Sequence, residues 1–424
     1  MNTSPPNSSG RGPIIPSQHV RSERLNRRLE VMAQYGANEK GGVNRQALSP
    51  EDLQAQLQMV RWAADLGLQP SIDPVGNLFL RFEGTDPWLA PVLTGSHLDS
   101  QPTGGRFDGV YGVLAALEAV EAIRNAGLRP RRAIEIVSWM NEEGSRFAPG
   151  MMGSRAYADP GSLSDILSVT DAGGVSVATA LEAIHNGLRE IPHRSLGGCP
   201  HAYIEAHIEQ GPELERQNKT IGVVTGIQGK RTFRVALVGE AAHAGTSHRS
   251  ERKDALMAAV RVIGALSQQF DDPDDVVKFT VGRLTVEPNA PSVVPNGVTF
   301  SIDLRHPDSK ELTILGNLIA PVCEAHRGPC SVSVQELSNA MSLEFASELR
   351  NCIRSAAAQL EIAHLDILSA AGHDARYMNQ VCASAMIFVP SHEGITHNEA
   401  EFTSLKDLVD GARVLADVLC DLAS

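Results

Sequence analysis

Apolar and polar positions follow two periodicities in the N-terminal part of the chain. Residues 49–67 carry apolar side chains at helical spacing behind a Ser-Pro-Glu-Asp start, which is typical of a helix N-terminus. Residues 71–81, 91–96 and 132–138 are short, largely apolar runs that predict strands, and residues 110–126 predict an apolar helix. The strand–helix–strand order over residues 91–138 predicts two parallel strands joined by a crossover.

A different rhythm covers residues 230–336. Strand and helix patterns alternate there in the order β-α-β-β-α-β, which is the order of a ferredoxin-like unit. The segments are residues 232–238, 253–270, 276–285, 297–304, 309–326 and 330–337. A buried strand over residues 383–389 and a helix over residues 403–420 follow, so the unit is expected to be an insertion.

The predicted fold class is therefore α/β. A mixed, mostly parallel sheet is expected in a catalytic domain of residues 19–228 and 339–424, with the inserted ferredoxin-like domain over residues 229–338. The first residues are rich in Pro, Ser, Asn and Gly, so residues 1–18 are predicted to be a disordered tail. A length of 424 residues exceeds one ordinary core and agrees with two domains.

Composition narrows the function classes. The chain has 37 Lys and Arg against 50 Asp and Glu, a formal net charge of −13, so no nucleic-acid or anionic-membrane surface is expected. Its six cysteines include no C-x-x-C pair, which argues against a disulfide framework or a cysteine zinc site. No apolar run reaches the roughly 18 residues of a membrane span, and the start lacks the apolar core of a signal peptide. A cytoplasmic protein is therefore expected.

Candidate chemistry gathers where the predicted parallel strands end. His97 and Asp99 follow one strand, Asp108 precedes the next helix, and Glu142 and Glu143 follow the second strand. The carboxyl ends of parallel strands meet at one edge of a sheet, where sites form. Imidazole and carboxylate together suit divalent first-row metals, and a further carboxylate suits the activation of water. The pattern predicts a metal-dependent hydrolase.

Each of these residues also has an ordinary structural explanation. Asp108 could cap the helix that follows it, and Glu142 and Glu143 could be exposed acids. His207 and His397, taken singly, would more often be structural residues than ligands. Two like charges at a buried strand end are nevertheless costly without a cation. The combination of three histidines with carboxylates near Gly-rich turns therefore favours a metal site.

Seven motifs occur in an order that carries a family resemblance. They are Thr94-Gly-Ser-His-Leu-Asp-Ser-Gln-Pro-Thr-Gly-Gly-Arg-Phe-Asp-Gly109, Asn141-Glu-Glu-Gly-Ser-Arg-Phe147, His207-Ile-Glu-Gln-Gly211, Glu240-Ala-Ala-His-Ala-Gly245, Ser301-Ile-Asp-Leu-Arg305, Ala371-Gly-His-Asp374 and Thr396-His-Asn398. Together they resemble the M20 family of dinuclear metallohydrolases. Within it they are similar to the branch of N-carbamoyl-L-amino-acid hydrolases, β-ureidopropionases and allantoate amidohydrolases. The resemblance covers residues 20–424, including the inserted domain.

The resemblance implies a centre with two divalent metal ions per subunit. His97 and His207 would bind the first ion, Glu143 and His397 would bind the second, and Asp108 would bridge both. Zinc is the first expectation, and manganese, cobalt or nickel would also accept this ligand set.

The resemblance also implies catalytic and substrate-binding roles. Glu142 would be the general base, and Asp99 would orient His97 through its second ring nitrogen. Gln210 and His243 would contact the substrate amide. His243 would also stabilise the oxyanion, either within its own subunit or across from the partner subunit. The inserted domain would form a homodimer and act as a lid.

Arg305 would bind the free carboxylate of a small-molecule substrate through its planar fork. The family usually has an asparagine shortly before this arginine, in an Asn-x-Ile/Val-Pro pattern. Ser292 occupies that position here, and Asn289 and Asn296 lie nearby but out of register. Ser292 and Asn296 are kept as candidate substrate contacts. Because serine lacks the donors and acceptor of an amide, the acyl group of the substrate stays open.

The expected activity is hydrolysis of the ureido C–N bond of an N-carbamoyl amino acid to the amino acid, carbon dioxide and ammonia. The alternative is another N-acyl amino acid or amino-acid conjugate, or allantoate, cleaved by the same chemistry. A non-catalytic binding or chaperone protein would require the loss of a ligand or the base, and none is lost. A nucleotide-dependent enzyme or a serine hydrolase is disfavoured, because the chain lacks P-loop spacing and a G-x-S-x-G motif.

Overall fold

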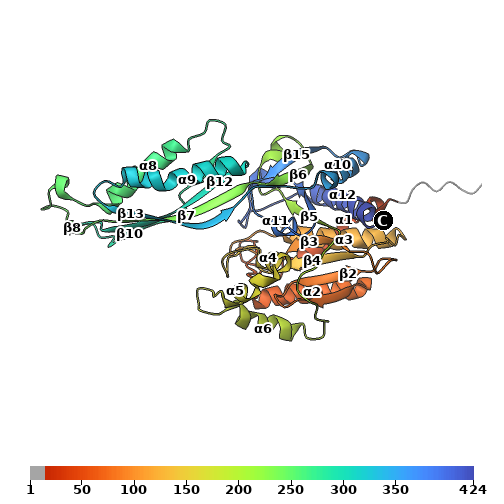
Figure 1. The fold of residues 1–424 in the computed structure, drawn as a ribbon. Helices are drawn as coiled ribbons and strands as arrows, with labels where there is room; N and C mark the ends of the chain where they lie inside the picture. The colour runs from red at the N-terminus through yellow and green to blue at the C-terminus, as the bar shows by residue number, and fades with distance from the viewer. Residues whose placement is uncertain (1–14) are drawn as a thin grey trace, which may run out of the picture. The chain divides into compact units, whose positions relative to one another are not determined.

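The computed structural model describes residues 15–424. These residues form two compact units. The first unit contains the described residues up to Thr225 together with Phe345–Ile367 and Gly372–Ser424. The second unit contains Gly226–Glu344 and Leu368–Ala371. Each unit is built on a β-sheet that is covered by helices (Figure 1).

The first unit is built on a mixed sheet. Its strand order is β1-β2-β4-β3-β5-β16-β6, and β15 pairs with β6. The strands are β1 (Gln69–Ile72), β2 (Leu78–Phe82), β3 (Val92–His97), β4 (Ile134–Trp139), β5 (Ala202–Ile208), β6 (Ile221–Ile227), β15 (His364–Ser369) and β16 (Ala383–Val389). Every residue of β3, β4 and β5 is buried, as is usual for strands covered on both faces.

The four central strands of this sheet are parallel to one another. β3 pairs in parallel with both β4 and β5, and β5 pairs in parallel with β16. Helix α3 (Val110–Asn125) connects β3 to β4, so the predicted parallel pair with a helical crossover is confirmed. The carboxyl ends of the four strands therefore lie at one edge of the sheet.

Helices pack against this sheet. α3 contacts β3, β4 and β5, and α12 (Leu405–Ala423) contacts α3, β5 and β16. α2 (Pro50–Leu66) begins at the predicted cap Ser49, whose hydroxyl accepts a hydrogen bond from the Asp52 N–H. Within residues 15–424, no helix combines the length and apolar character needed to cross a membrane. The other helices of the unit are α1 (Ser22–Met32), α4 (Met152–Ala158), α5 (Leu163–Ser168), α6 (Val177–Gly187), α7 (Glu213–Arg216), α10 (Ser347–Gln359) and α11 (Ala375–Met378).

The second unit has an antiparallel sheet with the order β10-β12-β7-β13, and β9 also pairs with β12. Helices α8 and α9 both lie over one face of this sheet (Figure 1). A separate two-stranded ribbon joins β8 and β11. The elements are β7 (Gly229–Val238), β8 (Ala242–His243), α8 (Ala255–Gln269), β9 (Lys278–Thr280), β10 (Leu284–Glu287), β11 (Val293–Val294), β12 (Gly297–His306), α9 (Ser309–His326) and β13 (Ser331–Ala340).

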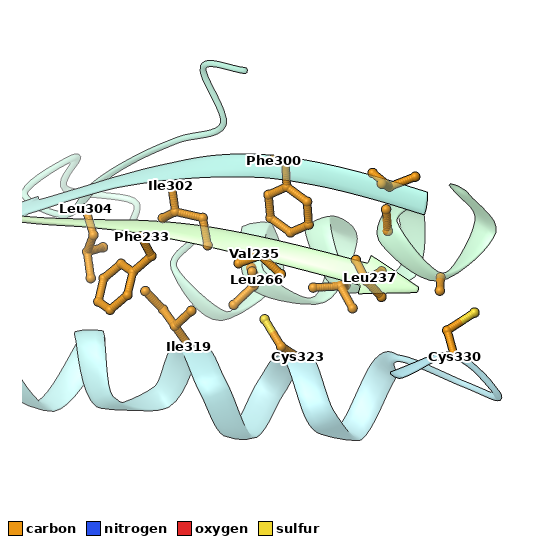
Figure 2. Close-up of a cluster of buried hydrophobic side chains, with 14 of the residues drawn as sticks. Phe233, Val235, Leu237, Leu266, Phe300, Ile302, Leu304, Ile319, Cys323 and Cys330 are labelled. Carbon is orange, nitrogen blue, oxygen red and sulfur yellow. The ribbon is translucent and has the colours of Figure 1, made fainter. Parts of the chain in front are cut away.

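The core of the second unit lies between the sheet and these two helices. Alternate residues of β7 and β12 point towards the helices, because successive side chains of a strand point to opposite faces. Figure 2 shows Phe233 and Phe300 from the sheet facing Ile319 and Cys323 of α9. The intervening residues of both strands are partly exposed, so the other face of the sheet is not covered by helices.

The long segment of the second unit, Gly226–Glu344, begins and ends in one antiparallel strand pair. Gly226 and Ile227 lie at the end of β6, and they pair with Glu344 and Leu343 of the short strand β14 (Leu343–Glu344). The chain therefore leaves for the second unit and returns from it at neighbouring positions.

Two predicted strands differ from the structure. Residues 71–81 are not one strand but part of the β1–β2 hairpin, because the Asp73 side chain accepts hydrogen bonds from the Val75 and Asn77 N–H groups and turns the chain. Residues 276–285 divide into β9 and the start of β10.

The predicted disordered tail of residues 1–18 also needs correction. Residues 1–14 lie outside the described residues. Pro16–His19 form a short 3-10 helix in which Pro16 and Ser17 are buried, so the prediction is wrong for residues 16–18. The Ser17 N–H donates a hydrogen bond to Asp417 of α12 at 2.9 Å, and this contact holds the segment to the first unit.

Candidate metal centre

The carboxyl ends of the four parallel strands supply the candidate ligands. His97 is the last residue of β3, His207 lies near the end of β5, Glu143 follows β4 and His397 follows β16. Asp108 comes from the loop between β3 and α3. The topology therefore brings together residues from five separate positions in the first unit, at the edge where such sheets form sites.

These five side chains form two groups that share Asp108. Asp108 Oδ1 lies 3.9 Å from Nε2 of His97 and 3.2 Å from Nε2 of His207. Asp108 Oδ2 lies 3.2 Å from Nε2 of His397, and that nitrogen is 3.4 Å from Oε2 of Glu143. The two groups have the same members as the two sets of ligands that the family resemblance implies.

Hydrogen bonds determine which ring nitrogen of the first two histidines faces Asp108. Nδ1 of His97 lies 2.9 Å from the Asp99 carbonyl oxygen, and Nδ1 of His207 lies 2.8 Å from the Ile208 carbonyl oxygen. A carbonyl only accepts, so each Nδ1 carries a proton and each Nε2 is the ring nitrogen that faces Asp108. The sequence predicted this contact for the Asp99 carboxylate, but its oxygen is 3.6 Å away and the carbonyl takes its place.

The Asp99 carboxylate holds the two glutamates instead. Its oxygens accept hydrogen bonds from the N–H groups of Glu142 and Glu143 at 3.1 and 3.2 Å. Oε2 of Glu142 lies 3.6 Å from Nε2 of His97, whereas the Glu143 carboxylate accepts a hydrogen bond from the Gln101 amide at 2.7 Å. The Glu142 side chain therefore lies beside His97, and the Glu143 side chain lies beside His397. The backbone of these two neighbouring residues thus contributes one side chain next to each group of candidate ligands.

The buried carboxylates of this centre fit a pair of divalent cations. Burial raises the pKa of Asp99 to about 7, and burial together with the charge of Asp108 raises the pKa of Glu143 to about 8. Burial and nearby carboxylates also raise the pKa of Glu142 well above its ordinary value. Burial opposes ionisation of Asp108, but hydrogen bonds from two histidines hold its pKa well below the usual range. Divalent ions would compensate this crowded negative charge, and imidazole and carboxylate are donors that first-row metals accept.

Glycine is required where the loop before α3 approaches His97. Gly109 has φ +65°, and a Cβ at this position would lie 2.3 Å from the His97 ring. At Gly105, a Cβ would lie 2.0 Å from the carboxylate of Glu401. The glycines on either side of Asp108 thus allow the backbone to pass close to the side chains of the centre.

A buried arginine behind the centre was missed by sequence analysis. Arg45 is 1% exposed, and its Nε donates a hydrogen bond at 2.7 Å to the carbonyl of Leu98, the residue between His97 and Asp99. Its NH1 donates to two further backbone carbonyls at 3.0 and 2.7 Å. The sequence offers no sign of this role, because Arg45 lies in a polar stretch before α2 and far from the motifs.

Glu401 was missed as well. Its Oε1 accepts hydrogen bonds from the N–H groups of Phe107 and Asp108 at 3.0 and 3.1 Å, and its Oε2 accepts one from the Thr396 hydroxyl at 3.0 Å. Burial raises the pKa of Glu401 to about 7. The carboxylate therefore ties the loop that carries Asp108 to the loop that carries His397. The motif at residues 396–398 lies close by and was the available signal.

A third group of candidate donors lies beside the first. Atoms of Glu205, His207 and His373 fall within 4.8 Å of one another. The Glu205 carboxylate already accepts hydrogen bonds from the hydroxyls of Ser96 and Tyr203 and from a backbone N–H. The rings of His207 and His373 pack edge to face with centroids 4.5 Å apart. We interpret Glu205 and His373 as residues that hold the His207 ring in position.

Three residues around the centre have a left-handed backbone. The φ angles are +54° at Asn141, +58° at Gln210 and +52° at His397. Such angles are uncommon for residues other than glycine, and they cluster at functional sites. The Gln210 amide, predicted to contact the substrate, donates hydrogen bonds to Asp108 Oδ2 at 2.9 Å and to the Thr396 hydroxyl at 3.3 Å. It therefore adjoins the carboxylate that the two groups share.

The other predicted site residues, His243, Ser292, Asn296 and Arg305, belong to the second unit. His243 is exposed, and its Nδ1 accepts hydrogen bonds from two backbone N–H groups at 3.0 and 3.2 Å. Nε2 of His243 therefore carries the ring proton and can donate it to a ligand. Ser292 lies at the same β8–β11 ribbon, since its carbonyl accepts from the Ala244 N–H at 3.1 Å.

The chain has extensive similarity to known amidohydrolases. Residues 93–421 match the peptidase family M20/M25/M40. Over 412 residues the chain is 36% identical to an N-carbamoyl-L-amino-acid amidohydrolase of Rhizobium meliloti, covering 96% of this chain and 98% of that protein. Over 401 residues it is 36% identical to an allantoate amidohydrolase of Bacillus subtilis, covering 93% and 96%. The crystal structure of an amidase of the hydantoinase/carbamoylase family from Burkholderia multivorans matches with a TM-score of 0.84 and 39% identity, covering 95% of this chain and 98% of that chain.

The α/β fold and these relatives define a hydrolase that cleaves amide bonds. The chain belongs to the peptidase family M20/M25/M40. Its similarity to the carbamoylase and allantoate amidohydrolase branch extends over nearly the whole chain.

Proposed function

We propose that this enzyme hydrolyses the ureido C–N bond of an N-carbamoyl-L-amino acid. The products would be the free amino acid and a carbamate, which breaks down to carbon dioxide and ammonia. The observation that carries this proposal is the Asp108 carboxylate, whose two oxygens face two separate groups of candidate ligands. Relatives named N-carbamoyl-L-amino-acid amidohydrolase support the choice of substrate.

His97, His207 and Asp108 would hold one divalent ion, and Asp108, Glu143 and His397 would hold a second. When bound, such ions polarise a carbonyl oxygen and make a water molecule acidic enough to attack it at neutral pH. Zinc is the first candidate, and manganese, cobalt and nickel suit the same donors.

Glu142 would act as the general base. Its carboxylate lies beside His97 and is not part of either group of candidate ligands, so it remains available to a substrate water. It would take a proton from the attacking water and return it to the leaving nitrogen, which needs a proton to depart. Asp99 would fix this base in place, because it accepts hydrogen bonds from the backbone of Glu142 and Glu143.

The second unit would supply substrate contacts. Arg305 would bind the carboxylate of the amino acid, and Nε2 of His243 would donate a hydrogen bond to the oxyanion as it forms. Gln210, Ser292 and Asn296 would contact the amide or ureido group. Arg305→Lys keeps the charge but loses the fork, so KM should rise at least about tenfold, with exposed Arg234→Lys as control.

We further propose that the second unit is a ferredoxin-like lid that also forms a homodimer. Its β-α-β-β-α-β order and its sheet order support the first part. If His243 acts across the dimer, mixing inactive His243→Ala with inactive Glu142→Gln should restore part of the activity. No recovery after verified subunit exchange would show that each chain builds its own site. The proposed location is the cytoplasm.

A second candidate function is hydrolysis of another N-acyl amino acid or of allantoate. Ser292 favours it, because a hydroxyl replaces the asparagine amide that the family usually has at this position. The relative named allantoate amidohydrolase, with the same degree of identity, also supports it.

A substrate panel tests these proposals. N-carbamoyl, N-formyl, N-acetyl and longer N-acyl amino acids should be compared with allantoate, with free amine and ammonia measured separately. Release of ammonia and amino acid in equal amounts from N-carbamoyl compounds supports the main proposal. Amine release from acyl compounds without turnover of any N-carbamoyl compound would replace it with the second.

A further inference from the structure

A cavity of about 530 Å³ opens in the second unit. Its lining includes Thr232 of β7, Thr280 of β9 and Ser301 of β12, three small hydroxyl side chains. Thr232 and Ser301 alternate with the buried residues of their strands, so the cavity lies on the sheet face that the helices leave uncovered. Its volume falls within the range of about 300–1,000 Å³ that is common for small-molecule sites.

Arg305 is fixed at this cavity by two neighbours. Its Nε and NH2 donate hydrogen bonds to the two carboxylate oxygens of Asp303 at 2.8 and 3.2 Å, and its NH1 donates to the Ala370 carbonyl at 2.7 Å. All three residues line the cavity. A guanidinium has five N–H donors, so one on NH1 and one on NH2 remain for a ligand carboxylate. Asp303 therefore orients the Arg305 guanidinium, which keeps two N–H groups for a ligand.

The charged side chains around the cavity carry one more positive charge than negative charge. Lys278 lies opposite Arg305 in the β9–β12 pair and also lines the cavity, but its ammonium is paired with Asp275. Lys230 is paired with Asp303 at 3.3 Å. Of the charged residues that line the cavity, Arg305 and Lys278 are cationic and Asp303 is anionic, and the partners of these residues outside the lining, Lys230 and Asp275, cancel each other. A single anionic group on a ligand would balance the remaining positive charge.

A β-bulge in β13 places the apolar side chain of Leu337 among the polar residues of the cavity. The pairing of β13 with β7 shifts between Glu336 and Ser338, so Leu337 is the additional residue. Such a bulge redirects side chains. Leu337 is 47% exposed and lines the cavity, whereas the Ser338 hydroxyl lies 2.6 Å from that of Thr232. The leucine surface is available to an apolar group that enters the cavity.

We propose that this cavity holds the side chain of the substrate's amino-acid portion, with Leu337 as a specificity-determining residue beside the carboxylate anchor Arg305. The substrate class is then an N-carbamoyl amino acid with an aliphatic side chain and one carboxylate. This inference rests on the proposed function and deepens it. Allantoate would place a polar ureido group against Leu337, and an N-carbamoyl derivative of aspartate would bring a second negative charge.

The test compares kcat/KM for N-carbamoyl-leucine and N-carbamoylglycine in wild type and Leu337→Ala. We expect wild type to prefer the leucine derivative and the variant to lose at least about tenfold of that preference, the effect of removing apolar contact in a pocket. The kcat/KM for N-carbamoylglycine should change far less than that for N-carbamoyl-leucine, because glycine has no side chain to contact Leu337. Val238→Ala is the matched control, because Val238 is 59% exposed in the same sheet and does not line the cavity. Ser301→Leu, which adds a bulky side chain to the cavity lining, should reduce the same preference independently.

Three outcomes would overturn the inference. The first is an unchanged preference in both folded variants. The second is a wild-type preference for N-carbamoyl-aspartate over N-carbamoyl-leucine. In both cases hydrolysis of N-carbamoyl compounds persists, so the proposed function stands while the cavity assignment fails. The third is the absence of turnover of any N-carbamoyl amino acid, which overturns the proposed function together with the inference.

Discussion

Gly109 and His97 lie so close together that no side chain fits between them. A Cβ on Gly109 would be 2.3 Å from the His97 imidazole, and the residue has φ +65°. Gly109→Ala should therefore push His97 away from Asp108 and lower both metal content and kcat by at least about tenfold, since small displacements of reacting groups are costly. Gly127→Ala is the control, because its φ is +72° with open space around the position. If both variants behave alike, backbone strain and not the contact explains the loss.

Metal content should reveal which residues are shared. Asp108 faces both groups of candidate ligands, whereas His397 belongs to one of them. Asp108→Ala should lose both ions, and His397→Ala should lose one, as measured by elemental analysis after dialysis. His392→Ala should lose neither, because His392 is exposed and paired with Glu215. Full activity of metal-stripped wild type would contradict the two-ion proposal altogether.

Glu142→Gln should separate proton transfer from metal binding. The amide has nearly the same shape but cannot accept the proton, so kcat should fall by at least about 10²-fold with both ions retained. Exposed Glu182→Gln on α6 provides the control. A near-normal kcat with full metal content would assign the base to another residue.

Arg45→Met should weaken the support of the segment between His97 and Asp99. The change would leave the Leu98 carbonyl and two others without their buried donor, at about 1–3 kcal/mol for each unsatisfied group. Chemical denaturation should show the loss of unfolding free energy, and Arg45→Lys should recover only part of it. A variant as stable as wild type would show that water replaces the guanidinium.

Apolar periodicity was sufficient to predict the parallel strand pair and the helix between them. It was also sufficient to place His97, Asp108 and Glu143 near one edge, because strand direction alone decides where strand ends meet. The glycines flanking Asp108 added the expectation of close backbone approach. These signals are local in sequence, and so they can be recognised without knowledge of the packing.

Other features depend on contacts between distant segments. Arg45 contacts Leu98 only after the chain has folded back, and Glu401 meets Asp108 from the opposite end of the sequence. The exposure of Leu337 results from a register shift that the pattern of apolar and polar residues does not predict. The atom with which Asp99 holds His97, a carbonyl in place of a carboxylate, likewise depends on backbone direction.

The pairing of Gly226 with Glu344 bears on how such a chain can change during evolution. Residues facing each other in an antiparallel ladder have Cα atoms about 5 Å apart, so a turn of two residues could close the gap. The segment from 227 to 343 therefore occupies the place of a hairpin loop between two paired strand residues. Its length can change without rerouting the strands on either side, so the side chains that line the cavity of the second unit can vary while the candidate ligands of the first unit keep their positions.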